Sequence, residues 1–283
     1  MKITILSGKG GTGKTTVSNN LAVLVKESFL IDCDVEEPNS HIFMAPEITE
    51  EEEIRTGYPV VDEDKCIHCR KCADFCHYNA IIAGAAATMP LKDLCHDCGG
   101  CQLVCPAGAI SYEKKGIGTI FSGTSRFGSR FLYGQLYTGE LSGVKIINRL
   151  NEKMSHSDLV LVDSPPGTSC STVAALEGSD YAVIVTEPTP FGVSDMKMVV
   201  EMLKEMNIPF SVVVNKAGLG DNEVYEYCSE ENLTITGEIP FERIVAEAYA
   251  SGKLAVEISE EHKSLYRNLW LNIQKEAERS HES

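Results

Sequence analysis

The chain has 283 residues, with 41 acidic against 25 basic side chains and a formal net charge of −16. This surplus of negative charge argues against a nucleic acid or an anionic membrane surface as partner. Eleven cysteines occur without an apolar leader or an apolar run of about 18–20 residues, which favours metal ligation in a reducing compartment. We therefore expect a cytoplasmic protein with no membrane contact.

The first segment predicts a nucleotide site. Residues 3–6 form a short apolar strand, residues 8–15 match G-x-x-x-x-G-K-[ST], and residues 15–26 have helical character. Such a loop wraps phosphates with backbone N–H groups, Lys14 would reach the terminal phosphates, and the Thr15 hydroxyl would bind Mg²⁺. The residues expected to contact the nucleotide here are Gly8, Lys9, Gly10, Gly11, Thr12, Gly13, Lys14, Thr15 and Thr16.

Three later strands end in polar residues that suit the same site. Residues 29–33 run into Asp32 and Asp34, and residues 159–162 run into Asp163 and a Pro-Pro-Gly loop. Residues 210–215 end in Asn215. In an open α/β sheet, ligands bind at the carboxyl ends of the strands, so these side chains are expected near the glycine loop.

The loop Lys9-Gly-Gly-Thr-Gly-Lys-Thr resembles the deviant phosphate loop of the MinD/ParA family, which includes the nitrogenase iron protein and Mrp-type cluster carriers. The resemblance implies an ATP-dependent homodimer in which Lys9 reaches the nucleotide of the partner subunit. It makes Lys9, Lys14 and Asp34 the catalytic candidates, with Asp34 orienting the attacking water.

The same resemblance implies the remaining roles. Asp32 would support the magnesium shell and Asp163 would hold Mg²⁺ through water. The other expected contacts are the γ-phosphate sensor Gly167, the base-edge residue Asn215, and Pro240 of the loop that packs on the base. Gly218 stands where a GTPase would place Asp, which favours adenine.

Eight of the cysteines form two runs of one pattern, C-x2-C-x2-C-x3-C. The runs are Cys66, Cys69, Cys72 and Cys76, then Cys95, Cys98, Cys101 and Cys105. This spacing is typical of cubane iron–sulfur ligation, and structural zinc is the main alternative. His68, His77 and His96 lie inside or beside the runs, and we interpret them as neighbours of the metal sites or solvent-facing residues.

Residues 59–113 resemble a two-cluster bacterial ferredoxin. The resemblance implies two [4Fe–4S] clusters with crossed ligation, in which the fourth cysteine of each run serves the other cluster. Cluster 1 would use Cys66, Cys69, Cys72 and Cys105, and cluster 2 would use Cys95, Cys98, Cys101 and Cys76. His77 replaces the proline that the family has after the fourth cysteine of the first run.

The predicted fold is an α/β P-loop ATPase, with a mostly parallel sheet covered by helices and a bacterial-type ferredoxin inserted into it. We expect ATPase residues at 1–57, the insert at 58–113, and the rest of the ATPase at 114–283. The acidic stretch 47–53 is interpreted as a solvated helix or linker, and residues 116–137 as two or three strands. From about 143 to 251 helices and strands alternate, beginning with a helix near 143–154 and a strand at 158–163, which predicts a mostly parallel sheet.

The tail and three remaining cysteines are less specific. Residues 260–283 predict a helix whose stripe of Leu265, Leu269, Ile273 and Ala277 packs on the parent domain. Cys33 and Cys228 are interpreted as small buried side chains. Cys170 follows Asp163 at the offset of a cluster ligand in the nitrogenase iron protein, so a ligand or redox role stands beside a capping or buried role.

Three functions remain open from the sequence. The first is an ATP-driven dimer that transfers electrons through its two clusters to a redox client. The second is an Mrp-type cluster carrier, although the short cysteine pair that those carriers use at their dimer interface is missing. The third is a MinD-like positioning ATPase, which the balanced charge of the tail disfavours.

Overall fold

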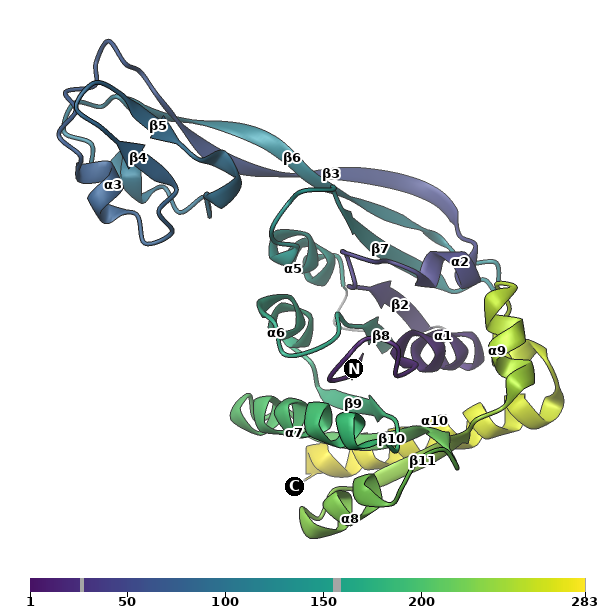
Figure 1. Ribbon diagram of the computed structural model, residues 1–283. Coiled ribbons are helices and arrows are strands. Elements are labelled where there is room, and N and C mark those ends of the chain that lie inside the picture. The colour runs from purple at the N-terminus through teal and green to yellow at the C-terminus, as the bar shows by residue number, and fades with distance from the viewer. Residues whose placement is uncertain (26–27, 155–158, 283) are drawn as a thin grey trace. The chain divides into compact units, whose positions relative to one another are not determined.

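The computed structural model describes residues 1–25, 28–154 and 159–282 (Figure 1). The predicted helix end at 26, the predicted strand start at 158 and the last residue, 283, lie outside the described residues. The chain forms two compact units. Unit 1 comprises Met1–Glu51, Ile120–Gln135 and Val144–Ser283, and unit 2 comprises Glu52–Thr119 and Leu136–Gly143.

A nine-stranded sheet of order β11-β10-β9-β1-β8-β2-β7-β6-β3 organises the chain. Its strands are β1 (Lys2–Leu6), β2 (Ser28–Asp32), β3 (Glu47–Val61), β6 (Ile110–Thr124), β7 (Arg130–Leu136), β8 (Leu159–Asp163), β9 (Tyr181–Thr186), β10 (Phe210–Ala217) and β11 (Ile235–Pro240). The pairings from β11 to β7 are all parallel. The predicted α/β P-loop sheet is thereby confirmed.

Helices cover both faces of the sheet in unit 1 (Figure 1). They are α1 (Lys14–Leu24), α2 (Ser40–Met44), α5 (Val144–Glu152), α6 (Cys170–Leu176), α7 (Pro190–Glu205), α8 (Glu223–Glu230), α9 (Arg243–Ala250) and α10 (Glu260–Glu282), with a 3₁₀ turn η2 (Ala255–Glu257). Because side chains alternate along a strand, β1 sends Ile3 and Ile5 into the core under α1 and α10, and Leu6 into the core under α7 and α8.

The tail helix packs as predicted. Leu269, Ile273 and Ala277 of α10 are buried in the core that α1 shares, and Leu265 and Trp270 pack beside them. Within the described residues, no helix combines the length and the apolar character needed to cross a membrane.

Unit 2 repeats its backbone along with its cysteine pattern. It contains α3 (Lys71–Phe75), α4 (Gly100–Leu103), a 3₁₀ turn η1 (Lys92–Leu94), and a two-stranded antiparallel sheet of β4 (Ile81–Ala83) and β5 (Thr88–Pro90). Left-handed residues stand at equivalent positions of the two cysteine runs, namely His68 and Asp97, Arg70 and Gly99, and Asn79 and Gly108. The two runs therefore fold as two copies of one turn–helix–turn.

One sequence prediction needs correction. The acidic stretch 47–53 is neither helix nor linker, because it begins β3, the edge strand of the sheet. Its glutamates are mostly exposed, and charged side chains are a common device for keeping a sheet edge from pairing with another chain. The segment predicted as an insert, residues 58–113, lies within unit 2, which begins at Glu52 and also takes in residues 136–143.

Candidate functional site

The glycine loop lies between β1 and α1 and borders a cleft of about 420 Å³ in unit 1. Small-molecule sites usually enclose roughly 300–1,000 Å³. Gly13 precedes α1 with a φ of 94°, a left-handed conformation, and a Cβ there would collide with the Asn215 side chain. Glycine is required at this position for both reasons.

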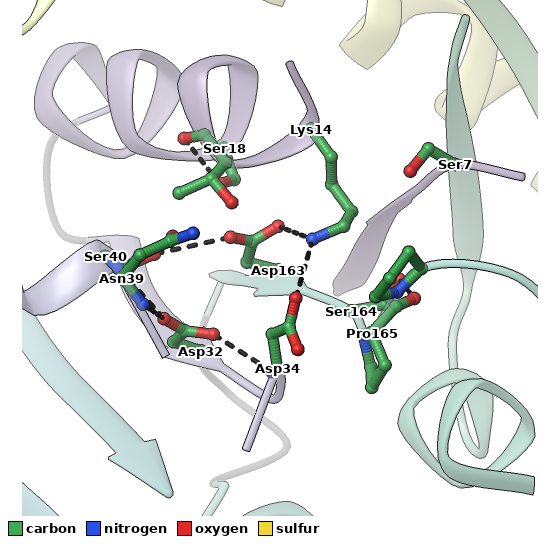
Figure 2. A network of polar contacts seen from close by, with 12 residues as sticks. Ser7, Lys14, Ser18, Asp32, Asp34, Asn39, Ser40, Asp163, Ser164 and Pro165 are labelled. Carbon is green, nitrogen blue, oxygen red and sulfur yellow. Dashed lines mark hydrogen bonds and ion pairs between the residues drawn. The ribbon is translucent and has the colours of Figure 1, made fainter. Parts of the chain in front are cut away.

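Lys14 joins the loop to the carboxylates at the strand ends (Figure 2). Its Nζ lies 3.2 Å from Asp163 Oδ1 and 3.6 Å from Asp34 Oδ2. Ser40 of α2 donates its hydroxyl to Asp163 Oδ2 at 3.3 Å. Asp163 and Lys14 are buried, so their charges interact in a poorly solvated environment.

Asp32 is held differently, by the backbone that follows it (Figure 2). Its carboxylate accepts N–H bonds from Asp34 at 3.0 Å, Asn39 at 3.2 Å and Ser40 at 3.0 Å. These bonds fold the segment between β2 and α2 around the carboxylate. The predicted site residues Lys14, Asp32 and Asp34 thus converge with the end of β8.

The electrostatics of this cluster leave it short of positive charge. Burial, and then the neighbouring Asp163 charge, raise the pKa of Asp32 to about 7. Burial also raises the pKa of Asp34 to about 6, although Lys14 opposes the shift. Burial alone would lower the pKa of Lys14, but Asp163, Asp34 and Asp32 outweigh it and raise that pKa. Three carboxylates facing one ammonium are suited to a divalent cation.

Lys9 is held on the rim of the cleft by a residue that the sequence analysis missed. Its Nζ lies 2.7 Å from Glu187 Oε1, and Lys216 Nζ lies 2.9 Å from Glu187 Oε2. Lys216 also donates to the Gly11 carbonyl at 3.0 Å. Glu187 directly follows β9, the neighbour of β1, so the strand-end rule that identified Asp163 would have found it too.

The other predicted contacts lie around the same cleft. Asn215 lines it and donates from Nδ2 to the Thr12 carbonyl at 2.7 Å. The Gly167 N–H donates to the Ser7 carbonyl at 2.8 Å, and its φ is 81°. Pro240 lines the cleft at the end of β11. Tyr249 and Tyr266 also line it, and no sequence signal pointed to either.

Unit 2 contains two small cavities, each lined by four cysteines. One is lined by Cys66, Cys69, Cys72 and Cys105, and the other by Cys76, Cys95, Cys98 and Cys101. The fourth cysteine of each run therefore lies with the first three of the other run. Below, these groups are cysteine set 1 and cysteine set 2, in that order.

Both sets receive backbone hydrogen bonds that suit thiolates. In set 2, the Ala80 N–H donates to Cys76 Sγ at 3.3 Å and the Asp97 N–H donates to Cys95 Sγ at 3.4 Å. In set 1, the Ala109 N–H donates to Cys105 Sγ at 3.3 Å. N–H donors near thiolate sulfur stabilise negative charge, which an iron–sulfur cluster brings to its ligands.

The residues with open roles are placed as follows. Cys33 and Cys228 are both buried, and burial raises the pKa of both thiols. Cys228 lies in the apolar core under α7 and α8, whereas Cys33 lies near charged side chains that include Lys2 and Asp163. Cys170 is exposed at the start of α6. His68 Nδ1 lies 3.7 Å from Cys66 Sγ. His96 stacks on Tyr78, with ring centroids 3.6 Å apart.

A parallel sheet whose first strand leads into a glycine loop, with acids at the ends of neighbouring strands, defines a P-loop nucleotide-binding protein. Residues 3–256 match the CobQ/CobB/MinD/ParA nucleotide binding domain, and the chain belongs to this family.

Known proteins from archaea are similar over most of the chain. The Methanocaldococcus jannaschii protein "Uncharacterized protein MJ0578" is 34% identical over 276 residues, which is 95% of this chain and 96% of that protein. The "Iron-sulfur cluster carrier protein" of Pyrococcus abyssi is 26% identical and covers 87% of this chain and 76% of its own. The septum site-determining protein MinD of Pyrococcus horikoshii, solved with Mg-ADP, has the same fold, with a TM-score of 0.60, 17% identity, and coverage of 95% and 93%.

Proposed function

We propose that the chain binds and hydrolyses Mg-ATP in the cleft of unit 1. Lys14 would leave its carboxylate partners for the β- and γ-phosphates, and Thr15 would bind Mg²⁺ while Asp32 and Asp163 hold its water shell. Asp34 would orient the attacking water. Gly167 would report the γ-phosphate, and Asn215 with Pro240 would hold adenine. The similar MinD of Pyrococcus horikoshii forms a complex with Mg-ADP, which supports this assignment.

Hydrolysis would take place in an ATP-dependent homodimer. Lys9 pairs with Glu187 of its own chain and is one-third exposed, so it would exchange that partner for a phosphate across the interface. Such an added cation stabilises charge in the transition state only when the dimer is closed. Nucleotide binding and dimerisation are thereby linked through one side chain.

Unit 2 would hold two [4Fe–4S] clusters as an inserted bacterial-type ferredoxin. One observation carries this proposal, namely the grouping of eight cysteines into two sets of four, each completed by the fourth cysteine of the other run. The sets fit the group because each surrounds one small cavity and receives N–H donors at its sulfurs. Clusters of this type accept and donate single electrons.

In the function we favour, the ATPase governs electron delivery from unit 2 to a redox client in the cytoplasm. Cluster delivery to an apo-protein is the second candidate, because the similar Pyrococcus abyssi protein has the name of an iron–sulfur cluster carrier. Ligands that cross between two runs favour retention, since releasing one cluster would also free a cysteine of the other run. A MinD-like positioning role is the third candidate, and in that case the clusters would act only as a redox sensor.

The deciding experiment follows iron rather than activity alone. Protein prepared without oxygen should contain about eight iron and eight sulfide per chain, the content of two complete clusters. Bound zinc without visible absorption would exclude the ferredoxin. The loaded protein is reduced with dithionite, freed of excess reductant and supplied with ATP, and it is then incubated with an apo-ferredoxin and, separately, with an oxidised heme electron acceptor. Acceptor reduction with retained iron supports electron transfer, whereas ATP-dependent loss of iron to the apo-protein supports the carrier.

A further inference from the structure

The two cysteine sets differ at one position that the repeat makes easy to compare. Tyr112 lies on β6, and its hydroxyl oxygen is 3.1 Å from Cys101 Sγ of set 2. The equivalent position after the first run is Ala83, at the end of β4, which has no polar side-chain atom. At this pair of equivalent positions, set 2 therefore has a side-chain hydroxyl near one of its sulfurs, and set 1 has none.

We propose that Tyr112 is a positioning residue that raises the reduction potential of the cluster in set 2 and leaves the cluster in set 1 unaffected. The inference rests on the proposed ferredoxin function. A ligating cysteine is a thiolate, which only accepts, so the Tyr112 O–H must donate to Cys101 Sγ. Reduction adds one electron and therefore negative charge, which strengthens this hydrogen bond and favours the reduced state. Hydrogen bonds to the sulfurs are among the features that set cluster potentials.

Other groups near the sulfurs affect the absolute potentials but not this comparison. Asp97 places a carboxylate beside set 2, where its Oδ2 accepts the Gly57 N–H at 2.8 Å, and negative charge lowers a potential. In set 1, Thr88 Oγ1 lies 3.5 Å from Cys66 Sγ, a longer and weaker contact. The difference between wild type and Tyr112→Phe isolates the hydroxyl, because all the other groups stay in place.

The experiment titrates the cluster-loaded chain with dithionite and records both couples by electron paramagnetic resonance. Tyr112→Phe should lower one midpoint potential by about 59 mV, the equivalent of a tenfold change in a one-electron equilibrium. The other midpoint should not move. Thr88→Val should lower the couple that Tyr112→Phe leaves alone, by a smaller amount. Tyr58→Phe is the matched control, because its hydroxyl donates to Glu113 at 2.8 Å and to no sulfur.

The outcomes separate this inference from the function on which it rests. A chain without iron refutes the ferredoxin, whereas two couples that Tyr112→Phe leaves in place refute only the role of Tyr112. Equal shifts of both couples also refute it, because they would indicate a general change in unit 2. If the Tyr112→Phe variant cannot be loaded with both clusters, incorporation of 3-fluorotyrosine tests for a shift of the midpoint potential in the opposite direction. The more acidic phenol donates more strongly, so one midpoint should rise, and an unchanged pair would refute the role.

Discussion

Asp32 offers a measurable link between the candidate site and stability. Its ordinary pKa is 3.8, and burial together with Asp163 raises it to about 7 in the folded chain. Between these values the folded state binds more protons than the unfolded state. The contribution of Asp32 to the free energy of unfolding therefore falls as pH rises from about 4 to 7, and it is level above that range.

Asp32→Asn removes this titration while keeping a side chain of the same size. One pKa unit corresponds to about 1.36 kcal/mol, so the two pH units between 5 and 7 amount to roughly 2–3 kcal/mol. Relative to wild type, the nucleotide-free variant should gain about that much stability between pH 5 and pH 8. The comparison uses the change in the free energy of unfolding between the two pH values, and not the free energy at either pH. Any pH-independent effect of Asn on the three N–H bonds therefore cancels.

The assay is urea unfolding of the cluster-loaded chain without nucleotide, followed by fluorescence. Trp270 is the single tryptophan and packs against the core of unit 1, so it reports on the unit that contains Asp32. Asp221→Asn is the matched control, because this carboxylate is exposed and accepts the Glu223 N–H at the start of α8. Parallel curves for wild type and Asp32→Asn from pH 5 to 8 would show that Asp32 is ionised throughout, and the reasoning would fail.

Three further predictions concern the nucleotide and the clusters. Lys14→Ala should weaken ATP binding at least a hundredfold by calorimetry, because it removes the charge facing the phosphates. Lys9→Ala should bind ATP nearly normally, but its rate of phosphate release should fall roughly 10³-fold and it should fail to dimerise. Lys216 pairs with the same carboxylate, Glu187, so Lys216→Ala is the control and should keep the wild-type rate. Normal hydrolysis by Lys9→Ala would reject the action of Lys9 across the dimer. Cys66→Ser and Cys105→Ser should damage the same cluster spectroscopically, and damage to different clusters would reject crossed ligation.

Much of the fold was predictable because its central strands are apolar and because glycine, proline and acidic residues follow them in the sequence. The strands β8, β9 and β10 appear in the sequence as runs of Val, Ile and Leu, since strands buried on both faces need no polar alternation. The start of β3 was not predictable for the opposite reason. Its glutamates form an edge strand with both faces largely in solvent, so neither the period of a strand nor that of a helix is visible.

The candidate site divides in the same way. Lys14 and Asp163 belong to local patterns in which the residue follows or ends a strand, and the structure brings them together. Glu187 also follows a strand and so comes under the same strand-end rule, but it belongs to no familiar motif, and the sheet order is needed to show that its strand is the neighbour of β1. Tyr249 and Tyr266 come from helices far along the chain, and their approach to the cleft depends on packing that no local pattern encodes.

One arrangement within unit 1 suggests how the nucleotide could influence the two strands that continue into unit 2. The helix α2 stands directly between the Asp32 segment and β3, and its Ser40 hydroxyl donates to Asp163. At the other end of α2, Arg126 of the β6–β7 turn donates from Nε to the Phe43 carbonyl at 2.9 Å. The same guanidinium pairs with Glu257 at 2.6 Å. A shift of Asp163 on phosphate binding would therefore act on α2 through Ser40. The strand β3 follows α2 in the chain, and the turn after β6 is hydrogen-bonded to α2 through Arg126. Switch segments respond to the γ-phosphate by such shifts. We therefore expect α2 to link ATP binding to the reduction potentials of the clusters. By thermodynamic reciprocity, reduction of the clusters should change ATP affinity by the same factor as ATP binding changes the reduction equilibrium.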